Sequence, residues 1–455
     1  MKTIFITIFQ GVEAKNILRT GIVKRLLEDS RVRVVLFVGN KEKAQLYQRE
    51  FSHPRMIYEI VPRPLTTALD RFFASLKFQL LRTDTTHLRK KMAFEKEGNR
   101  ILFFASKTWN WIIARKPLLR FARFLDYRFV HDATYSHYFE TYRPDIVFMA
   151  HLFDEQEIHL LREAKKRNIR TIGFINSWDK VTARCVLRLL PDRFVVFNDI
   201  VKEELATHNA VDPSHIFIGG IPQYDLYFKR TDGTRDDFFK AIGSEPQKKL
   251  IVYAPMGSAF SGSDWDMLDV LCRYNKKGVF GNAVDLLVRF QPNDFIDKKE
   301  LEKRPWLLYD YPGIRFSSKR GVDWDMSAED VNHLAHTLAH MSVLVCYASS
   351  MSVDAAIFDK PVININFELK HMPLHKSPTQ FYHMAHYKKA LCTGGIRCVE
   401  NEKELIGWIR RYIGNPSLDA GGRDTLVRQQ CFHTDGESGR RIGEYILSFL
   451  HTRNV

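Results

Sequence analysis

Short apolar runs alternate with longer amphipathic stretches along most of the chain, a pattern that predicts strands separated by helices. Lys2 to Phe9 is β-branched and aromatic, a glycine follows at position 11, and Asn16 to Glu28 carries apolar residues at helical spacing before a second β-rich run at Val32 to Val38. Strand, glycine turn, helix and strand in this order are the opening of a parallel doubly wound domain.

The same alternation continues in both halves of the chain. Further strands are predicted at 145–150, 171–175, 193–197 and 216–220, and then at 249–254, 286–290, 314–316, 343–347 and 362–366. Helices are predicted at 155–167, at 200–208 and over 404–450, with a break at Asn415-Pro416. We therefore predict an α/β protein with two Rossmann-like domains facing across a cleft: an N-terminal domain over 1–228, a linker over 229–248 and a C-terminal domain over 249–455.

One region of the N-terminal half departs from this pattern. Residues 62–128 are helical, aromatic and basic, with Trp109, Trp111 and a group of cations at Arg115, Lys116, Arg120 and Arg123. Such an insertion either packs its aromatics on the domain and leaves its cations in water, or lies on an anionic membrane surface with both. The residues by themselves leave both interpretations open.

The charge of the chain limits its partners. The 455 residues include 68 Lys and Arg against 53 Asp and Glu, a net charge of +15 and an isoelectric point near 9.4. Such a surface attracts nucleic acid, anionic membranes or phosphorylated substrates. No helix-turn-helix, zinc-finger spacing or RNP-like strand is present, so nucleic acid is not expected.

Other composition features indicate where the protein works. The six cysteines form no C-x-x-C pair, the N-terminus has no small-residue cleavage site, and no stretch approaches about 18 uncharged apolar residues. We expect reduced thiols and a cytoplasmic protein, with the inner face of the plasma membrane as a peripheral site.

The strongest local signal lies between Val343 and Phe367. A buried strand is followed by Ser349 and Ser350, by a helix that carries Asp354, and by a further strand. A helix N-terminus beyond a strand favours phosphate, the two hydroxyls can donate to a diphosphate, and the carboxylate can accept from ribose hydroxyls. The alternative is structural, with Ser350 capping the helix and Asp354 complementing its dipole.

This segment also carries a family resemblance. The pattern Y-x-S-S-x-x-x-D-A followed by K-P-V resembles the donor-binding helix of GT-B enzymes, in particular of the CDP-glycerol glycerophosphotransferase and capsular-polysaccharide transferase group. The strand ends LIVYAP and LVRFQP resemble that group too, although Gln291 stands where a histidine is expected. That departure favours a sugar donor over a polyol-phosphate donor.

The resemblance implies further donor contacts in the C-terminal domain. Arg289 at the end of its strand is expected to grip diphosphate oxygens as charge develops on the leaving group. Gly257 and Ser258 form a turn that can approach the phosphate, and Gln291 follows the 286–290 strand as a further donor-binding candidate. Four histidines after the 362–366 strand are candidates for contacts to the donor sugar: His371, His375, His383 and His386.

Catalytic candidates follow strands of the N-terminal half. An acceptor hydroxyl needs a carboxylate or imidazole within hydrogen-bond reach to take its proton. Asp179, beside Trp178, is the leading candidate, because an indole next to a carboxylate suits sugar binding. Further candidates are Glu13 at the first strand-to-helix turn and, after the 145–150 strand, His151 and Asp154.

These observations predict a GT-B glycosyltransferase that moves a sugar from a nucleotide-diphosphate donor to a surface-glycan or lipid-linked acceptor with inversion. No cofactor is expected beyond the nucleotide sugar as co-substrate, and no metal, since neither the D-W-D pairs nor His333, His336 and His340 form a metal motif. Three alternatives stay open: a CDP-glycerol-type polyol-phosphate transferase, a UDP-sugar 2-epimerase-like enzyme, and a non-catalytic binding protein of glycan assembly.

Overall fold

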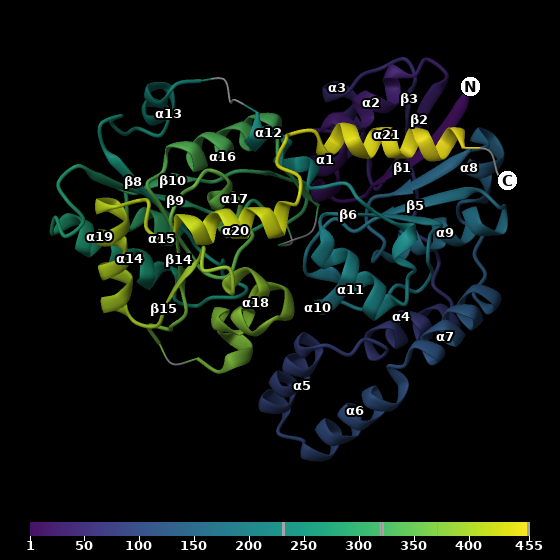
Figure 1. Cartoon of the computed structure of the whole chain (residues 1–455), viewed down its shortest axis with the longest axis horizontal. Helices are drawn as coiled ribbons and strands as arrows, with labels where there is room; N and C mark the ends of the chain where they lie inside the picture. Colours follow the sequence, from purple (N-terminus) through teal and green to yellow (C-terminus); the bar gives the residue numbers. More distant parts are fainter. Residues whose placement is uncertain (230–232, 319, 321–322, 371, 453–455) are drawn as a thin grey trace. The chain divides into compact units, whose positions relative to one another are not determined.

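The chain forms two compact α/β units (Figure 1). Unit 1 comprises Met1–Asp225 and Cys431–Val455, and unit 2 comprises Leu226–Gln430. The structure is a computed structural model that describes residues 1–229, 233–318, 320, 323–370 and 372–452. The predicted fold class, two doubly wound domains with a helical basic insertion in the first, is confirmed.

Unit 1 is built on a seven-stranded parallel sheet in the order β3-β2-β1-β4-β5-β6-β7. Its strands are β1 (Lys2–Ile8), β2 (Val32–Val38), β3 (Met56–Ile60), β4 (Ile146–Met149), β5 (Arg170–Phe174), β6 (Arg193–Val196) and β7 (Ile216–Ile218). β1 pairs with β2 on one side and with β4 on the other, so the strand order reverses at β1. Loops beyond the carboxyl ends of β1 and β4 therefore diverge and leave room for a ligand.

Helices cover both faces of this sheet, as the continuous burial of its strands requires. They are α1 (Gly11–Ile17), α2 (Gly21–Glu28), α3 (Lys41–Glu50), α8 (Ser136–Tyr142), α9 (Glu155–Lys166), α10 (Lys180–Ala183) and α11 (Asp199–Asn209), with α21 (Ser438–His451) from the end of the chain. The single helix predicted over 16–28 was wrong. The chain breaks at Thr20, whose side chain accepts from Ile22 N and starts a new helix.

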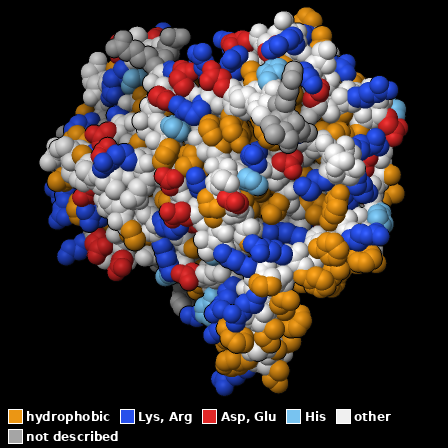
Figure 2. All heavy atoms as spheres, turned by 45° about the vertical axis from the view of Figure 1, so that its right-hand side comes forward, with side chains coloured by type: hydrophobic (Ala, Val, Ile, Leu, Met, Phe, Trp, Pro, Cys, Tyr) orange, Lys and Arg blue, Asp and Glu red, His pale blue; other side chains and the backbone are white. Residues whose placement is uncertain are grey.

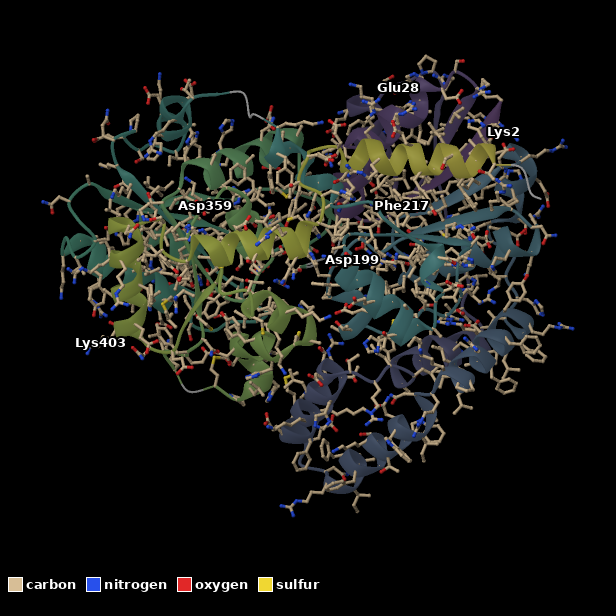
Figure 3. The ribbon with its side chains drawn as sticks, viewed as in Figure 1. Lys2, Glu28, Asp199, Phe217, Asp359 and Lys403 are labelled. Atoms are coloured by element: carbon tan, nitrogen blue, oxygen red, sulfur yellow. The ribbon has the colours of Figure 1, made fainter. Side chains whose placement is uncertain are left out.

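The C-terminal helix α21 packs in unit 1, whereas the predicted C-terminal domain extended to residue 455. A Cβ on Gly439 would lie 2.6 Å from Gly21 N, so the two backbones approach closely. Asp225 accepts from Ser438 N at 2.9 Å and from Gly439 N at 2.7 Å. Phe217 of β7 stacks on Tyr445 of α21 with ring centroids 4.1 Å apart (Figure 3). These contacts are long-range, and helical periodicity does not encode them.

The insertion of unit 1 consists of α4 (Ala68–Gln79), α5 (Asp84–Glu97), α6 (Arg100–Ile113) and α7 (Lys116–Phe129). A small apolar cluster joins them to the rest of the unit: Leu80, Leu81, Ile113, Leu119 and Val186. Hydrophobic and basic side chains lie side by side over its surface, at the bottom of the view in Figure 2. Among the described residues, no helix is both long and apolar enough to cross a membrane.

Buried ion pairs anchor the insertion to the sheet domain. Arg162 of α9 contacts Asp126 of α7 at 2.7 Å, and Arg188 contacts the same carboxylate at 2.7 Å and Asp70 of α4 at 2.8 Å. His159 of α9 lies 3.3 Å from Asp70. All of these side chains are at most 2% exposed. Each charge is compensated by a partner on another helix or on the loop that carries Arg188, so the network fixes how α4 and α7 pack on α9.

Unit 2 holds a six-stranded parallel sheet in the order β10-β9-β8-β13-β14-β15. Its strands are β8 (Lys249–Ala254), β9 (Val284–Arg289), β10 (Leu308–Asp310), β13 (Val343–Cys346), β14 (Val362–Ile365) and β15 (Arg397–Val399). Its helices are α12 (Asp225–Phe228, which begins at the last residue of unit 1), α13 (Arg235–Ala241), α14 (Asp264–Lys276), α15 (Lys298–Glu302), α16 (Ala328–His340), α17 (Met351–Ile357), α18 (Ala385–Leu391), α19 (Glu402–Gly414) and α20 (Ala420–Cys431, which ends in unit 1). Part of the predicted linker, residues 230–232, lies outside the described residues.

One predicted strand of unit 2 has a different place in the structure. β11 (Ile314–Arg315) pairs with β12 (Trp324–Asp325) in a separate antiparallel sheet. The edge of the main sheet is taken instead by β10, and its other edge by β15, neither of which was predicted. Both edges are three residues long and only partly buried, so they give no apolar run in the sequence.

The Arg188→Met variant tests the buried network. Removing the guanidinium leaves the buried Asp70 without its arginine and leaves Asp126 with Arg162 alone, which costs about 3–5 kcal/mol. We expect the free energy of unfolding of unit 1 to fall by that amount. A urea titration monitored by circular dichroism measures it. Arg167→Met is the matched control, because its partners Glu163 and Glu140 form a more exposed cluster worth about 1 kcal/mol. Equal effects of the two changes would contradict the anchoring role.

Candidate functional site

Candidate residues of unit 1 gather beyond the carboxyl ends of β1, β4 and β5. Glu13 lies in α1 after β1, His151 follows β4, and Asp179 follows β5. Asp154 and Lys180 both lie close enough to act electrostatically on Glu13. Parallel strands end at one edge of the sheet, which is why segments about 140 and 165 residues apart meet here.

Glu13 is a buried carboxyl with one oxygen engaged. Its Oε2 accepts from Phe9 N at 2.5 Å and from Gln10 N at 3.0 Å, while Oε1 is buried and has no hydrogen-bond partner among the described residues. Burial raises the pKa of Glu13 to about 7, against the two backbone donors that lower it. A carboxyl with a pKa near neutrality and an unengaged oxygen is suited to proton transfer.

A second buried carboxyl, Glu157 of α9, was not among the predicted residues. Its Oε1 accepts from the Thr7 hydroxyl at 2.6 Å and its Oε2 accepts from His151 N at 2.7 Å. Burial raises its pKa well above the ordinary value, and the nearby Glu13 raises it further. Two carboxyls in one buried region resist simultaneous ionisation, so they titrate as a coupled pair. The sequence signal is one of two acids in the first turn of a helix, where acids ordinarily complement the helix dipole.

Lys180 supplies positive charge to this acidic cluster. Its Nζ donates to Asn176 Oδ1 at 2.6 Å. Burial lowers its pKa to about 8, while Asp179 and Glu13 favour the charged form. Neighbouring His151 is 3% exposed, and burial together with the Lys180 charge holds its pKa well below the usual range, so its imidazole is neutral.

Asp154 and Asp179 have structural partners as well. Asp154 caps α9 by accepting from Gln156 N at 2.9 Å, and Gln10 Nε2 lies 3.4 Å from its other oxygen. Asp179 accepts from the Ser177 hydroxyl. The Trp178 ring packs against Phe197 with centroids 5.2 Å apart, so its indole is part of an aromatic cluster.

The predicted donor helix of unit 2 is a short helix of about two turns, α17, set on a buried polar network. Tyr387 of α18 accepts from Ser349 N at 3.2 Å and donates to Asn364 Oδ1 at 2.5 Å. Ser352 joins the same network, with its hydroxyl 3.0 Å from that of Tyr387. The network fixes the turn between β13 and α17, so its geometry is set before any ligand binds.

Ser349, Ser350 and Asp354 differ in exposure and in hydrogen bonding. Ser349 Oγ accepts from Met351 N at 3.2 Å, whereas Ser350 is exposed and its side chain makes no capping bond. The capping role considered for Ser350 is therefore absent. Asp354 is 6% exposed and lies near Arg289 around the buried hydroxyl of Tyr227.

Arg289 is the last residue of β9 and is 4% exposed. Its Nη1 contacts Asp310 Oδ2 at 3.0 Å, and His333 Nε2 lies 2.9 Å from the other oxygen of that carboxylate. Asp310 is its register partner on β10. The guanidinium thus has a fixed counter-ion in the structure, and a bound phosphate would share it with Asp310.

Gly257, Ser258 and Gln291 line a cavity of about 340 Å³ at the ends of β8 and β9. Its aromatic walls include Trp265 and Phe290, and its acids are Asp264, Asp294 and Asp297. Ser258 N and Oγ face Asp294 at 3.1 and 3.4 Å, so the predicted phosphate donors already serve a carboxylate. Gly257 has φ +89°, and a Cβ there would lie 2.2 Å from Asp294 Oδ2, which explains the glycine.

Gln291 and the histidines complete the predicted donor set. Gln291 Nε2 donates to Met256 O at 2.7 Å and its Oε1 accepts from Arg320 at 3.0 Å, so it bridges two loops. His383 is exposed at the end of a 3₁₀ turn, His375 and His386 are partly exposed, and His371 lies outside the described residues. No three His, Cys, Asp or Glu side chains within the described ranges are arranged to hold a metal ion.

Solved structures with the same architecture cover almost the whole chain. A UDP-N-acetylglucosamine 2-epimerase from Listeria monocytogenes matches with a TM-score of 0.55 at 11% identity, over 100% of this chain and 98% of that one. The epimerase from Neisseria meningitidis bound to UDP-GlcNAc matches at 0.53 and 10%, over 98% and 100%. A variant of the wall teichoic acid polymerase TagF matches at 0.52 and 12%, over 99% and 89%. At these identities the likeness shows the fold alone, and no curated protein matches the chain.

Two doubly wound parallel units over the full length of such structures define the GT-B fold. The class of activity, a transferase that uses a nucleotide-activated donor, comes from the family match. The family model for CDP-glycerol:poly(glycerophosphate) glycerophosphotransferases matches residues 189–448, more than half of the chain. The chain belongs to that family. The resemblance found in the sequence is thereby confirmed, and the family model favours the polyol-phosphate alternative over the sugar donor. Gln291 bridges two loops, which gives this residue a structural use at the position where the resemblance expects histidine.

The Glu13→Gln variant tests the buried carboxyl through stability. A folded-state pKa of about 7 against an ordinary 4.5 means that the fold favours the protonated form. The stability of the wild type is therefore highest below pH 4.5 as far as Glu13 is concerned, and that contribution is lost as pH rises through 7. We expect a smaller fall in melting temperature from pH 5 to pH 8 in the variant. Exposed Glu42→Gln is the control, and an unchanged pH dependence in both would contradict the shift.

Proposed function

We propose that the protein transfers a polyol phosphate from a CDP-linked donor, CDP-glycerol in the simplest case, to a hydroxyl of a growing polyol-phosphate polymer. The family match supports this activity over sugar transfer. The observation that carries the catalytic part is Glu13, a buried carboxyl with an unengaged oxygen and a pKa near 7 at the point where the strand order of unit 1 reverses.

The reaction forms one phosphodiester bond and breaks one phosphoanhydride bond. The acceptor hydroxyl oxygen attacks the donor phosphorus that carries glycerol, and CMP leaves with the electrons of the broken P–O bond. The hydroxyl proton passes to Glu13 Oε1, and Lys180 stabilises the carboxylate before transfer. Asp179, Asp154 and His151 are proposed to orient the acceptor, since Asp179 and Asp154 each already accept a hydrogen bond from a neighbouring side chain or backbone N–H.

The donor is assigned to unit 2. Ser349 and the exposed Ser350 are proposed to donate to the phosphates, Asp354 to accept from ribose hydroxyls, and Arg289 to stabilise the phosphate of the departing CMP. Gly257, Ser258 and Gln291 would contact the donor only from the neighbouring acidic cavity. His383 is exposed and available to the transferred polyol.

Turnover of a donor panel by Glu13→Gln and wild type tests both parts. With CDP-glycerol and a glycerophosphate oligomer, we expect CMP release by the wild type and a fall of about 10²–10⁴-fold in kcat for the variant at similar KM. Glu42→Gln is the control, and the wild-type rate should fall as pH drops through about 7.

Two outcomes would decide against the proposal. Release of UDP from a UDP-sugar, with CDP-glycerol left intact, would support the sugar transferase instead. Full activity of Glu13→Gln would mean that Glu13 is not the base. Asp179 would then be the candidate, and loss of activity in Asp179→Asn would identify it.

The insertion is proposed to hold the enzyme on an anionic membrane surface, where a lipid-linked acceptor resides. Residues 68–129 contain 14 Lys or Arg against five Asp or Glu. Fourteen large apolar side chains between Leu65 and Phe129 are more than a third exposed, among them Phe121 at 57% and Phe124 at 60%. Exposed aromatics mixed with cations are typical of interfacial surfaces.

Neutralising Arg115, Lys116 and Arg120 tests the membrane surface. Each cation near an anionic surface contributes about 1 kcal/mol, so the triple Gln variant should bind phosphatidylglycerol vesicles about 100-fold more weakly in flotation. Arg123 is left out because it is partly buried and donates to Leu187 O and Asn209 O, which anchors α7. The control removes three exposed cations elsewhere in unit 1: Lys24, Lys41 and Arg49. Equal losses would mean that net charge alone drives binding.

A further inference from the structure

The insertion encloses a cavity of about 630 Å³ between α5 and α6. Its lining combines cations, hydroxyls and aromatic rings, among them Arg82, Thr83, Lys90, Phe104, Lys107 and Trp111. Neither the family match nor the proposed chemistry assigns a role to this cavity.

The cavity carries an excess of positive charge. Three Lys or Arg side chains, Arg82, Lys90 and Lys107, line it against one carboxylate, Asp84. Arg82 and Lys107 form no ion pair or hydrogen bond with the part of the protein that the structure describes. Like charges held around one cavity repel each other, and an anion between them would relieve that repulsion.

The walls of the cavity are fixed by hydrogen bonds. Asn110 Nδ2 donates to Gln79 O at 2.5 Å and to Leu81 O at 2.9 Å, which ties α6 to the turn before α5. Lys90 Nζ donates to Ser106 O at 2.9 Å and links the two helices, with two further N–H groups available. Thr83 Oγ1 donates to Thr182 O at 2.7 Å and attaches the start of α5 to α10. Lys90 is therefore held in place at the wall of the cavity, whereas Arg82 and Lys107 are exposed side chains at its lining.

The rim of the cavity is apolar. Phe104 is 62% and Trp111 51% exposed, and the neighbouring Leu102 and Ile112 are 59% and 47% exposed. A phosphate site for a soluble ligand gains nothing from such a rim. A lipid that carries a phosphate gains binding free energy from both of its parts. The anion contacts the cations, and the hydrocarbon chain packs against the aromatic rings.

Helix α5 lies between this cavity and the candidate acceptor residue Asp179. Thr86, His87 and Lys90 of α5 line the cavity, whereas Arg89 of the same helix lies close enough to Asp179 and Arg184 for their charges to act on it. A group bound between α5 and α6 is therefore separated from the candidate acceptor residues by the width of one helix.

We propose that the cavity between α5 and α6 binds a phosphate group carried by a lipid. The proposal concerns a lipid with a terminal phosphate, and it rests on the cavity alone and not on the proposed function. The phosphate contacts Lys90, Lys107 and Arg82, and the hydrocarbon chain follows the Phe104 and Trp111 rim into the membrane.

Vesicle binding by the full chain tests this proposal. The probes are phosphatidylcholine vesicles with phosphatidic acid, which exposes a terminal phosphate, or with phosphatidylglycerol, whose phosphate is esterified on both sides, at equal surface charge. Lys90→Gln/Lys107→Gln removes the cavity cations, and Arg100→Gln/Arg120→Gln removes two exposed cations of α6 and α7 outside the cavity. We expect the cavity variant to lose about tenfold more affinity than its control on phosphatidic acid, and equal losses on phosphatidylglycerol.

Other outcomes separate the sources of the phosphate. Equal losses of the two variants on both vesicles would overturn the proposal, because surface charge would then suffice. Thermal protection by inorganic phosphate as strong as that by phosphatidic acid would overturn the lipid part. The single Arg82→Gln variant, which loses no intramolecular partner among the described residues, must show the same selective loss, so misfolding cannot account for it. Binding is measured without turnover, and failure of glycerophosphate transfer is therefore a separate result.

Discussion

The ion pairs of Asp126 and Asp70 with Arg162 and Arg188 hold unit 1 together as a functional whole. They fasten α4 and α7 to α9, and α9 also carries Glu157 of the acidic cluster. The same anchoring brings α5, which lies between α4 and α7 in the chain, against α10 next to Asp179. The insertion can thus present the proposed membrane surface and lipid phosphate site at a fixed distance from the candidate catalytic residues, because charges buried with partners on several helices do not rearrange cheaply.

The reversal of strand order at β1 creates the chemistry of the site. Backbone N–H groups of Phe9 and Gln10 hold Glu13, Thr7 and the His151 N–H hold Glu157, and Lys180 balances them. Burial keeps a proton within this group near neutral pH, whereas the same carboxyls in water would be fully ionised. A group that accepts a proton at pH 7 from a hydroxyl is what transfer to an alcohol requires.

The two candidate regions of unit 2 differ in character. The turn before α17 is built on the Tyr387–Asn364 network and presents an exposed Ser350, a setting that suits a ligand arriving from solvent. The cavity at Gly257 and Asp294 is acidic, and its Ser258 N–H already donates to the Asp294 carboxylate. Arg289 pairs with Asp310 of the neighbouring strand, and His333 contacts the same carboxylate. In the proposed catalytic role, a phosphate would have to compete with Asp310 for the guanidinium.

The fold class, most strands and the helical insertion could be predicted from the amino-acid order, because a strand buried on both faces must be continuously apolar and a helix must show its period. The residues that follow strands, Glu13, His151, Asp154 and Asp179, could be found in the same way, since strand ends are visible in one dimension. The three-dimensional structure was needed to reveal Glu157 and Lys180 as partners of Glu13, the partial burial of Arg123, the place of α21 in unit 1 and the structural use of Gln291. Each of these depends on which distant segments meet, and a pKa or an ion pair is set by neighbours in space, which local residue patterns do not specify.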